Sequence, residues 1–217
     1  MTAPAVSSTT DYASPASNAT SWQIFTGLSV NKGSILAVSA RIESGGGGSN
    51  LSTASSGWQQ LGTTVQDNGG GFQTSSAVFY KTQNGSGEFT LASTVSMQFT
   101  AMLVAIDSAE EIEATVTADS ANPPSHTISA SGARDVLWIA VASSGTGAAS
   151  GGPLGYSGFD KADPAGEDGP FTAVAYRSTR AMTENPATFT GVSGETAAWT
   201  IALYVDRRRK ARGGAII

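Results

Sequence analysis

The stretch TAVAYRSTR at residues 172–180 repeats the pattern of SAVFYKTQ at residues 76–83, about a hundred positions earlier. Each stretch runs through small residues and Val to a Tyr, which a basic residue follows, so that Tyr176 corresponds to Tyr80. Four further pairs match in the same order: 34–43 with 135–144, 57–58 with 155–156, Phe89 with Phe189, and 100–107 with 198–206. Five matches in one order indicate two copies of one unit.

The repeated unit decides the fold. Its short alternating apolar runs are separated by Gly-rich turns, which is the pattern of strands. A single copy would expose the apolar face of its sheet, whereas two copies can bury these faces against each other. We therefore predict an all-β protein, a jelly-roll-like antiparallel β-sandwich built from two tandem, similar halves. Two independent β domains are the alternative arrangement.

The composition favours this fold class and excludes several kinds of site. The chain has 217 residues, enough for a sizeable core, and only 13% of them are charged, which leaves little material for solvated amphipathic helices. It has no Cys, so disulfides and thiolate metal sites are excluded. Its single His cannot form a metal site that needs two or three His ligands. We expect no membrane contact, because no apolar run reaches the roughly 18 residues of a span.

The chain divides into a central sandwich and two terminal segments. The first residues are Ser, Thr, Ala and Pro in low-complexity order, which is typical of an arm without a core of its own. We predict an extended N-terminal arm at 1–21, one sandwich at 22–206 with half one at 22–107, a linker at 108–127 and half two at 128–206, and a basic C-terminal tail at 207–217.

Two segments carry more detailed predictions. The linker contains EIEATVTA at 111–118, whose alternation predicts one more strand. The long apolar stretch at 88–107 predicts two strands with a turn near Val95 and Ser96.

The charges are divided between an acidic body and the basic tail. All 17 acidic residues precede the tail, and five of the 12 basic residues lie within it: Arg207, Arg208, Arg209, Lys210 and Arg212. These five are candidate assembly contacts to a protein partner. Nucleic acid and a merely solvated end are the other interpretations of the tail, and the acidic body disfavours nucleic acid because it repels phosphate.

The sequence points to no catalytic, cofactor-binding or metal-binding residue. His126 is the only His, so any His-based catalysis must use it, and no nucleophile lies near it at a recognised spacing. The stretch FDKADPAGEDG at 159–169 gathers four acids, Asp160, Asp163, Glu167 and Asp168. Such a cluster could hold Ca²⁺, although its spacing fits no established Ca²⁺ loop, and a solvated turn is the other interpretation.

Four aromatic residues stand apart from the predicted core: Trp22, Phe25, Tyr156 and Phe159. Most aromatic residues fall inside predicted strands, as packing requires. Tyr156 and Phe159 instead fall in predicted loops, where an aromatic ring can stack on a sugar. They are therefore candidate glycan contacts.

The order of motifs in the first half resembles that of a widespread set of phage and prophage virion proteins. The motifs are KGSILAVSA at 32–40, GWQQLG at 57–62, AVFYKT at 77–82 and AMLVAID at 101–107. Lys32-Gly33-Ser34 stands where those proteins usually have Gly-Asp. The resemblance covers residues 28–107 and extends more loosely to the second half, and its motifs encode strands, turns and core residues.

The resemblance implies a non-enzymatic structural subunit of a tailed-phage virion, in the tail, the fibre or the capsid decoration. Such a subunit is made in the host cytoplasm and contacts other virion proteins and copies of itself. The resemblance carries over no catalytic residue and no cofactor. The alternative is a carbohydrate-binding β-sandwich module that recognises host-surface glycans.

Overall fold

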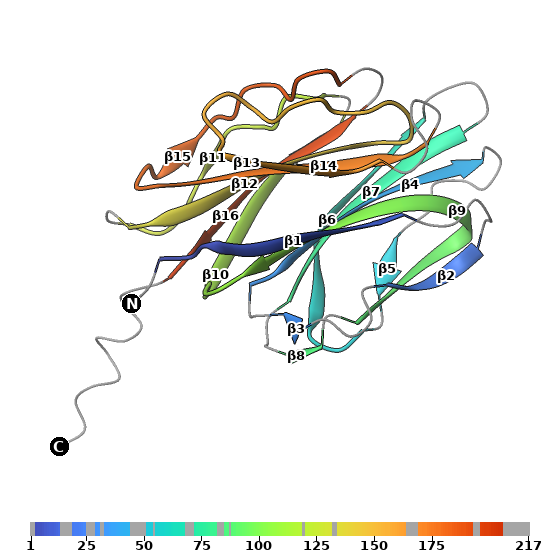
Figure 1. Cartoon of the computed structure of the whole chain (residues 1–217), viewed down its shortest axis with the longest axis horizontal. Coiled ribbons are helices and arrows are strands. Elements are labelled where there is room, and N and C mark those ends of the chain that lie inside the picture. The colour runs from blue at the N-terminus through green and yellow to red at the C-terminus, as the bar shows by residue number, and fades with distance from the viewer. Residues whose placement is uncertain are drawn as a thin grey trace.

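The computed structural model is all-β: the described residues form sixteen strands and no helix. The described residues are 3–13, 19–24, 29–30, 33–43, 51–53, 55–67, 72–81, 85–86, 88–118, 120–131, 134–163, 169–192 and 196–205. No helix among them is long and apolar enough to cross a membrane. The strands form two large antiparallel sheets and two small ones (Figure 1).

The first sheet is built from the N-terminal half of the chain. Its strand order is β1 (Val6–Ala13), β9 (Phe89–Ile106), β4 (Ile35–Glu43), β7 (Phe72–Lys81) and β6 (Trp58–Asp67). Two short strands, β2 (Ala19–Ile24) and β5 (Ser52–Thr53), also pair with β9. A separate pair joins β3 (Ser29–Val30) to β8 (Gly85–Ser86).

The second sheet is built from the C-terminal half. Its order is β10 (Glu111–Thr117), β16 (Ala197–Tyr204), β12 (Val136–Ser144), β14 (Phe171–Thr179) and β13 (Gly158–Ala162). A small pair again accompanies it, β11 (His126–Thr127) with β15 (Thr183–Glu184). Each sheet is drawn from one half of the chain, a simpler connectivity than the double Greek key of a jelly roll.

The two sheets have the same strand order. In each, the first strand of the half lies at one edge beside the last strand, and the third and fourth strands form the hairpin at the other edge. The small pairs also correspond, because each joins the segment before the second strand to the loop after the fourth. This order is consistent with two tandem units, whose common origin stays an inference from the sequence.

The boundaries of the halves differ from those predicted. Val6–Ala13 is not part of a free arm but is the edge strand β1, which pairs with β9. Its Ser and Thr residues suit a solvated sheet edge, which is why a low-complexity stretch can form a strand. The predicted strand in the linker is confirmed as β10, and it belongs to the second sheet rather than to a connection.

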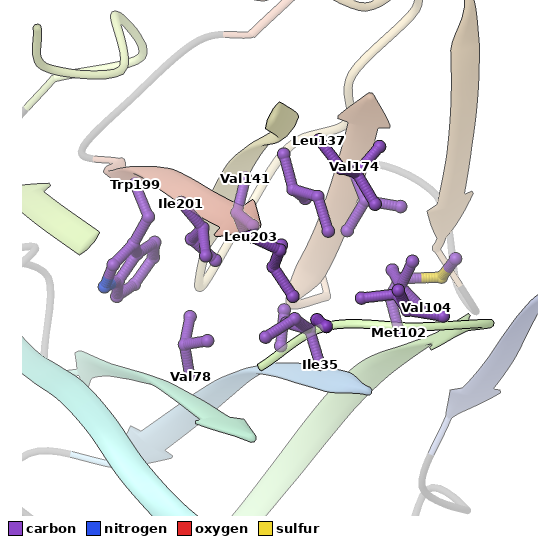
Figure 2. Packing of buried hydrophobic residues seen from close by; sticks show 14 of the residues in the cluster. Ile35, Val78, Met102, Val104, Leu137, Val141, Val174, Trp199, Ile201 and Leu203 are labelled. Carbon is purple, nitrogen blue, oxygen red and sulfur yellow. The ribbon is translucent and has the colours of Figure 1, made fainter. Parts of the chain in front are cut away.

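The sheets pack face to face around a shared core. Figure 2 shows side chains of the second sheet, among them Trp199 and Ile201, pointing toward Val78 and Ile35 of the first. The full set of labelled core residues is Ile35, Val78, Met102, Val104, Leu137, Val141, Val174, Trp199, Ile201 and Leu203, and all are buried. This packing makes the protein a β-sandwich.

Part of the outer face of each sheet is buried as well. In the first sheet Leu36 and Phe79 belong to a second cluster, on the opposite side from the shared core. In the second sheet Trp138 and Tyr204 belong to an outer cluster. Every residue of β12 is therefore buried, which explains why that strand reads as an uninterrupted apolar run.

The predicted turn near Val95 and Ser96 is wrong, because β9 runs unbroken from Phe89 to Ile106. The strand is nevertheless irregular there. Ala19 pairs with Met97 but Ser21 pairs with Ala92, so the register shifts across residues 93–96. The residues that suggested a turn therefore lie at a β-bulge, where the long strand β9 changes its neighbouring strands.

Candidate functional site

The outer face of the second sheet carries a cluster of titratable side chains. Strand β10 places Ile112 and Ala114 against the shared core, so the alternation of a strand turns Glu113 and Thr115 to the outer face. The segment that contains β11 crosses this face and brings His126 to the same place. The cluster therefore joins an edge strand to the segment that covers the sheet.

Glu113 is the centre of the cluster. Its Oε1 accepts a hydrogen bond from the Tyr204 hydroxyl and another, 2.7 Å long, from the Ser129 hydroxyl. The Ser129 backbone N–H donates to Oε2 at 2.9 Å. Burial alone would raise the pKa of Glu113, but these bonds and the nearby His126 outweigh it and lower the pKa below its ordinary value.

Tyr204 is the donor of the hydrogen bond from its hydroxyl to Oε1 of Glu113. Burial, followed by the hydrogen bond to the carboxylate of Glu113, raises the pKa of Tyr204 to about 12. The phenol therefore stays protonated at neutral pH and acts as a donor. The guanidinium of Arg134 lies over the Tyr204 ring at 5.1 Å.

His126 is held between a hydroxyl and an indole. A hydrogen bond of 2.8 Å joins its Nδ1 to Oγ1 of Thr115, and its ring meets Trp138 edge-on at 6.0 Å. Its Nε2 lies 3.6 Å from Oε2 of Glu113. Burial lowers the pKa of His126, and the carboxylate of Glu113 opposes this shift without reversing it. His126 is therefore mainly neutral at pH 7.

This geometry is not that of a nucleophilic triad. In a triad the hydroxyl donates to the imidazole, which in turn donates to the carboxylate. Here the Thr115 hydroxyl meets Nδ1 of His126, but Nε2 of His126 makes no hydrogen bond with any described residue and lies 3.6 Å from Oε2 of Glu113. The Ser129 hydroxyl bypasses the imidazole and donates directly to Glu113. The cluster is arranged to fasten residues 126–129 to β10.

A second polar group lies on the same face. The side chain of Arg177 donates to Glu184 through Nη2 at 2.6 Å and through Nε at 3.2 Å. Glu184 is only 2% exposed and pairs with His126 in the β11–β15 ladder. These two hydrogen bonds offset the cost of burying the charge of Glu184, and they anchor β15 to β14.

The structure places the two candidate glycan residues differently from each other. Tyr156 packs against the outer core clusters of the second sheet, and the Arg177 guanidinium lies 5.2 Å from its ring centre. Burial, opposed only in part by Arg177, raises the pKa of the Tyr156 hydroxyl well above its ordinary value. One face of this ring is thus occupied. Phe159 is 38% exposed at the edge strand β13.

The first sheet has an equivalent of the Tyr156 contact. Lys81 lies over the ring of Trp58 at 5.6 Å, as Arg177 lies over Tyr156. The residue before each ring, Gly57 or Gly155, has a positive φ, of 80° and 85° respectively. Sequence reasoning matched these pairs separately, but it missed that the basic residue and the ring touch.

The acidic loop is described only in part. The Thr9 hydroxyl donates to Oδ2 of Asp160 at 2.5 Å, and the Lys161 ammonium donates to Oδ2 of Asp163 at 3.2 Å. Within the described ranges, no group of three or more His, Cys, Asp or Glu is placed to hold a metal ion. Glu167 and Asp168 lie outside the described residues, as do the tail residues Arg207, Arg208, Arg209, Lys210 and Arg212.

Asp160 instead links the two sheets. Thr9 belongs to β1 and Asp160 to β13, so their hydrogen bond joins the edges of the first and second sheets. Two more bonds cross the interior: Ser39 donates to the Ser144 carbonyl at 2.7 Å, and the hydroxyls of Thr100 and Thr172 lie 2.9 Å apart.

Comparisons of the chain with protein-family models, with curated proteins and with solved structures give no match.

Proposed function

We propose that the protein is a non-enzymatic structural subunit of a tailed-phage virion, in the tail, the fibre or the capsid decoration. It acts through contacts with other virion proteins and with copies of itself. Its place of action is the particle, after synthesis in the host cytoplasm.

The observation that supports this proposal is that polar side chains on the outer face of the second sheet bind other parts of the protein. Glu113 binds Ser129 and Tyr204, and Glu184 binds Arg177. Both carboxylates are engaged in holding a covering segment on the second sheet: Glu113 holds Ser129, and Glu184 joins β15 to Arg177 of β14. Such a design favours stability of the body, as a subunit of an assembly needs, and the motif order of residues 28–107 favours the virion class.

Mass spectrometry of purified particles tests the proposal. Particles of the phage or prophage that encodes the chain should contain it at a fixed copy number after the particles are banded on a density gradient. Its absence from banded particles, with the protein present in the lysate, would overturn the proposal. A particle in which the chain lacks 207–217 then tests the tail, because loss of incorporation with an intact body is expected for an assembly contact.

A second candidate function is glycan binding at the outer face of the second sheet. The observation that favours it is the exposure of two large apolar side chains five residues apart in the sequence, Phe159 at 38% and Leu154 at 89%. A glycan array with the purified protein tests it, with Phe159→Ala and Tyr156→Ala as variants. Since Arg177 covers one face of the Tyr156 ring, we expect any sugar contact to depend more on Phe159. No binding to any glycan would eliminate this candidate.

A further inference from the structure

The four edges of the two large sheets differ in how they are protected. An open edge strand presents unpaired backbone groups, and proteins usually guard it with charge, with Pro or with a cover. Edge β1 meets β13 across the gap between the sheets through the Thr9–Asp160 bond. Edge β10 carries Glu111 and Glu113.

Edge β6 is not guarded by charge or by Pro along most of its length. From Trp58 to Gln66 it has no charged residue and no Pro, and Asp67 is its last residue. It lies at the end of the first sheet, and no described strand pairs with its outer side. One irregularity, at Leu61, separates Gln60 from Gly62 in the register with β7. The regular part of the edge is therefore Gly62–Asp67.

The exposed side of β6 is apolar at one place. Val65 is 38% exposed, and among the described residues the other exposed large hydrophobic side chains are Val116, Leu154 and Phe159. Its neighbour Thr63 pairs with Ala77 of the outer core cluster, so Thr63 and Val65 both lie on the outer face of the first sheet.

The sequence of this edge is complementary to itself. Two copies of β6 that run antiparallel and are centred on Val65 would bring the two valines together, and would set Asp67 of each copy opposite Thr63 of the other. No like charges meet in this arrangement. Pairing β10 with its own copy about Ile112 or about Glu113 would set Glu side chains directly opposite each other, which is destabilising in a sheet.

We propose that two copies of this chain associate by antiparallel pairing of their β6 edges at Thr63–Asp67, centred on Val65. The first sheets of both copies then form one continuous sheet across a two-fold axis. The proposal deepens the proposed function, on which it rests only for the expectation that copies of the chain meet. Because one strand pair buries a small area, the dimer is weak, with a dissociation constant on the order of micromolar.

Charge substitution at the centre of the pairing tests the proposal. In sedimentation velocity of the full chain at about 100 μM, the wild-type protein should be a dimer. Val65→Lys and Val65→Glu should each be monomers at that concentration, because like charges face each other at the axis. An equimolar mixture of the two variants should restore the dimer, since Lys then faces Glu.

The controls separate this result from misfolding. Val65→Thr should keep the dimer, and Leu154→Lys, at the 89% exposed side chain in the loop before β13, should keep it too. Thermal unfolding of every variant checks that the fold is intact. A second measurement, amide hydrogen exchange of the wild-type chain, should show protection of Thr63–Asp67 that increases with protein concentration.

A monomeric wild-type chain at about 100 μM, a dimer that persists in both charged variants, or a mixture that stays monomeric would each overturn the proposal. So would exchange at Thr63–Asp67 that does not depend on concentration. None of these outcomes bears on whether the protein occurs in virions, which particle mass spectrometry decides separately.

Discussion

Glu113 and His126 make the stability of the protein depend on pH in one direction. The pKa of folded His126 lies below its ordinary 6.5, so the unfolded chain binds a proton more readily as pH falls below 6.5. The pKa of folded Glu113 lies below its ordinary 4.5, so its stabilisation is complete above pH 4.5 and is lost as pH falls through the folded value. Both groups therefore destabilise the fold on acidification, in successive windows.

Urea unfolding between about pH 7.5 and about pH 3 measures this dependence. We expect the free energy of unfolding to decline in two steps, and His126→Gln to remove the upper step while the lower one persists. Because the amide of Gln does not titrate, any decline that remains in the variant between about pH 7.5 and about pH 4.5 comes from groups other than His126. A decline below pH 6.5 of equal size in the variant would show that His126 is not responsible.

Gly57 and Gly155 are predicted to be intolerant of a side chain for the same two reasons. Each has a positive φ, and an added Cβ would lie 3.2 Å from Nζ of Lys81 or 3.0 Å from Nη1 of Arg177. Changing either to Ala should lower the free energy of unfolding by about 1–2 kcal/mol. Gly62→Ala is the matched control, since its Cβ would be in ordinary contact at 3.6 Å from Trp199 Nε1. Equal stability of all three variants would contradict the expectation.

At the scale of elements, β1 tests whether the N-terminal segment is a strand or an arm. Tyr12 stacks on Phe99 at 5.6 Å in the outer core cluster, while Asp11 is exposed. Tyr12→Ala should therefore cost about 2–3 kcal/mol of unfolding free energy, and Asp11→Ala less than about 0.5 kcal/mol. Chemical denaturation measures both. If neither change has an effect, β1 does not contribute to the sheet in solution.

The sequence match between the last strands is consistent with the structure. When 100–107 and 198–206 are aligned on their closing Asp residues, Met102 of β9 falls opposite Ile201 of β16, and both belong to the shared core. The match of 34–43 with 135–144 was out of step, because it paired Ile35 of the shared core with Val136 of an outer cluster. Since β12 is buried on both faces, its residues show no alternation that could have fixed the register.

The cluster around Glu113 could not be predicted from the sequence, for a related reason. Glu113 and Tyr204 are far apart in the chain and meet only because β10 pairs with β16. The alternation of EIEATVT placed Glu113 opposite the core face, but it named no partner. His126 was identified as the single His, and its contacts with Thr115 and Trp138 depend on how the covering segment folds back.

At the scale of the whole molecule, each half supplies one wall of the same core. Ile35 and Val78 come from the first half, and Trp199 and Ile201 from the second (Figure 2). Neither sheet can keep this face buried without the other. The bonds between Ser39 and the Ser144 carbonyl and between Thr100 and Thr172 would be lost together with the core. The halves should therefore unfold as one cooperative unit.

Differential scanning calorimetry of the full chain tests this unity most directly. We expect one transition whose calorimetric enthalpy equals its van't Hoff enthalpy, as for a single cooperative unit. Two transitions, or a calorimetric enthalpy close to twice the van't Hoff value, would mean that the halves are independent domains and would contradict the shared core.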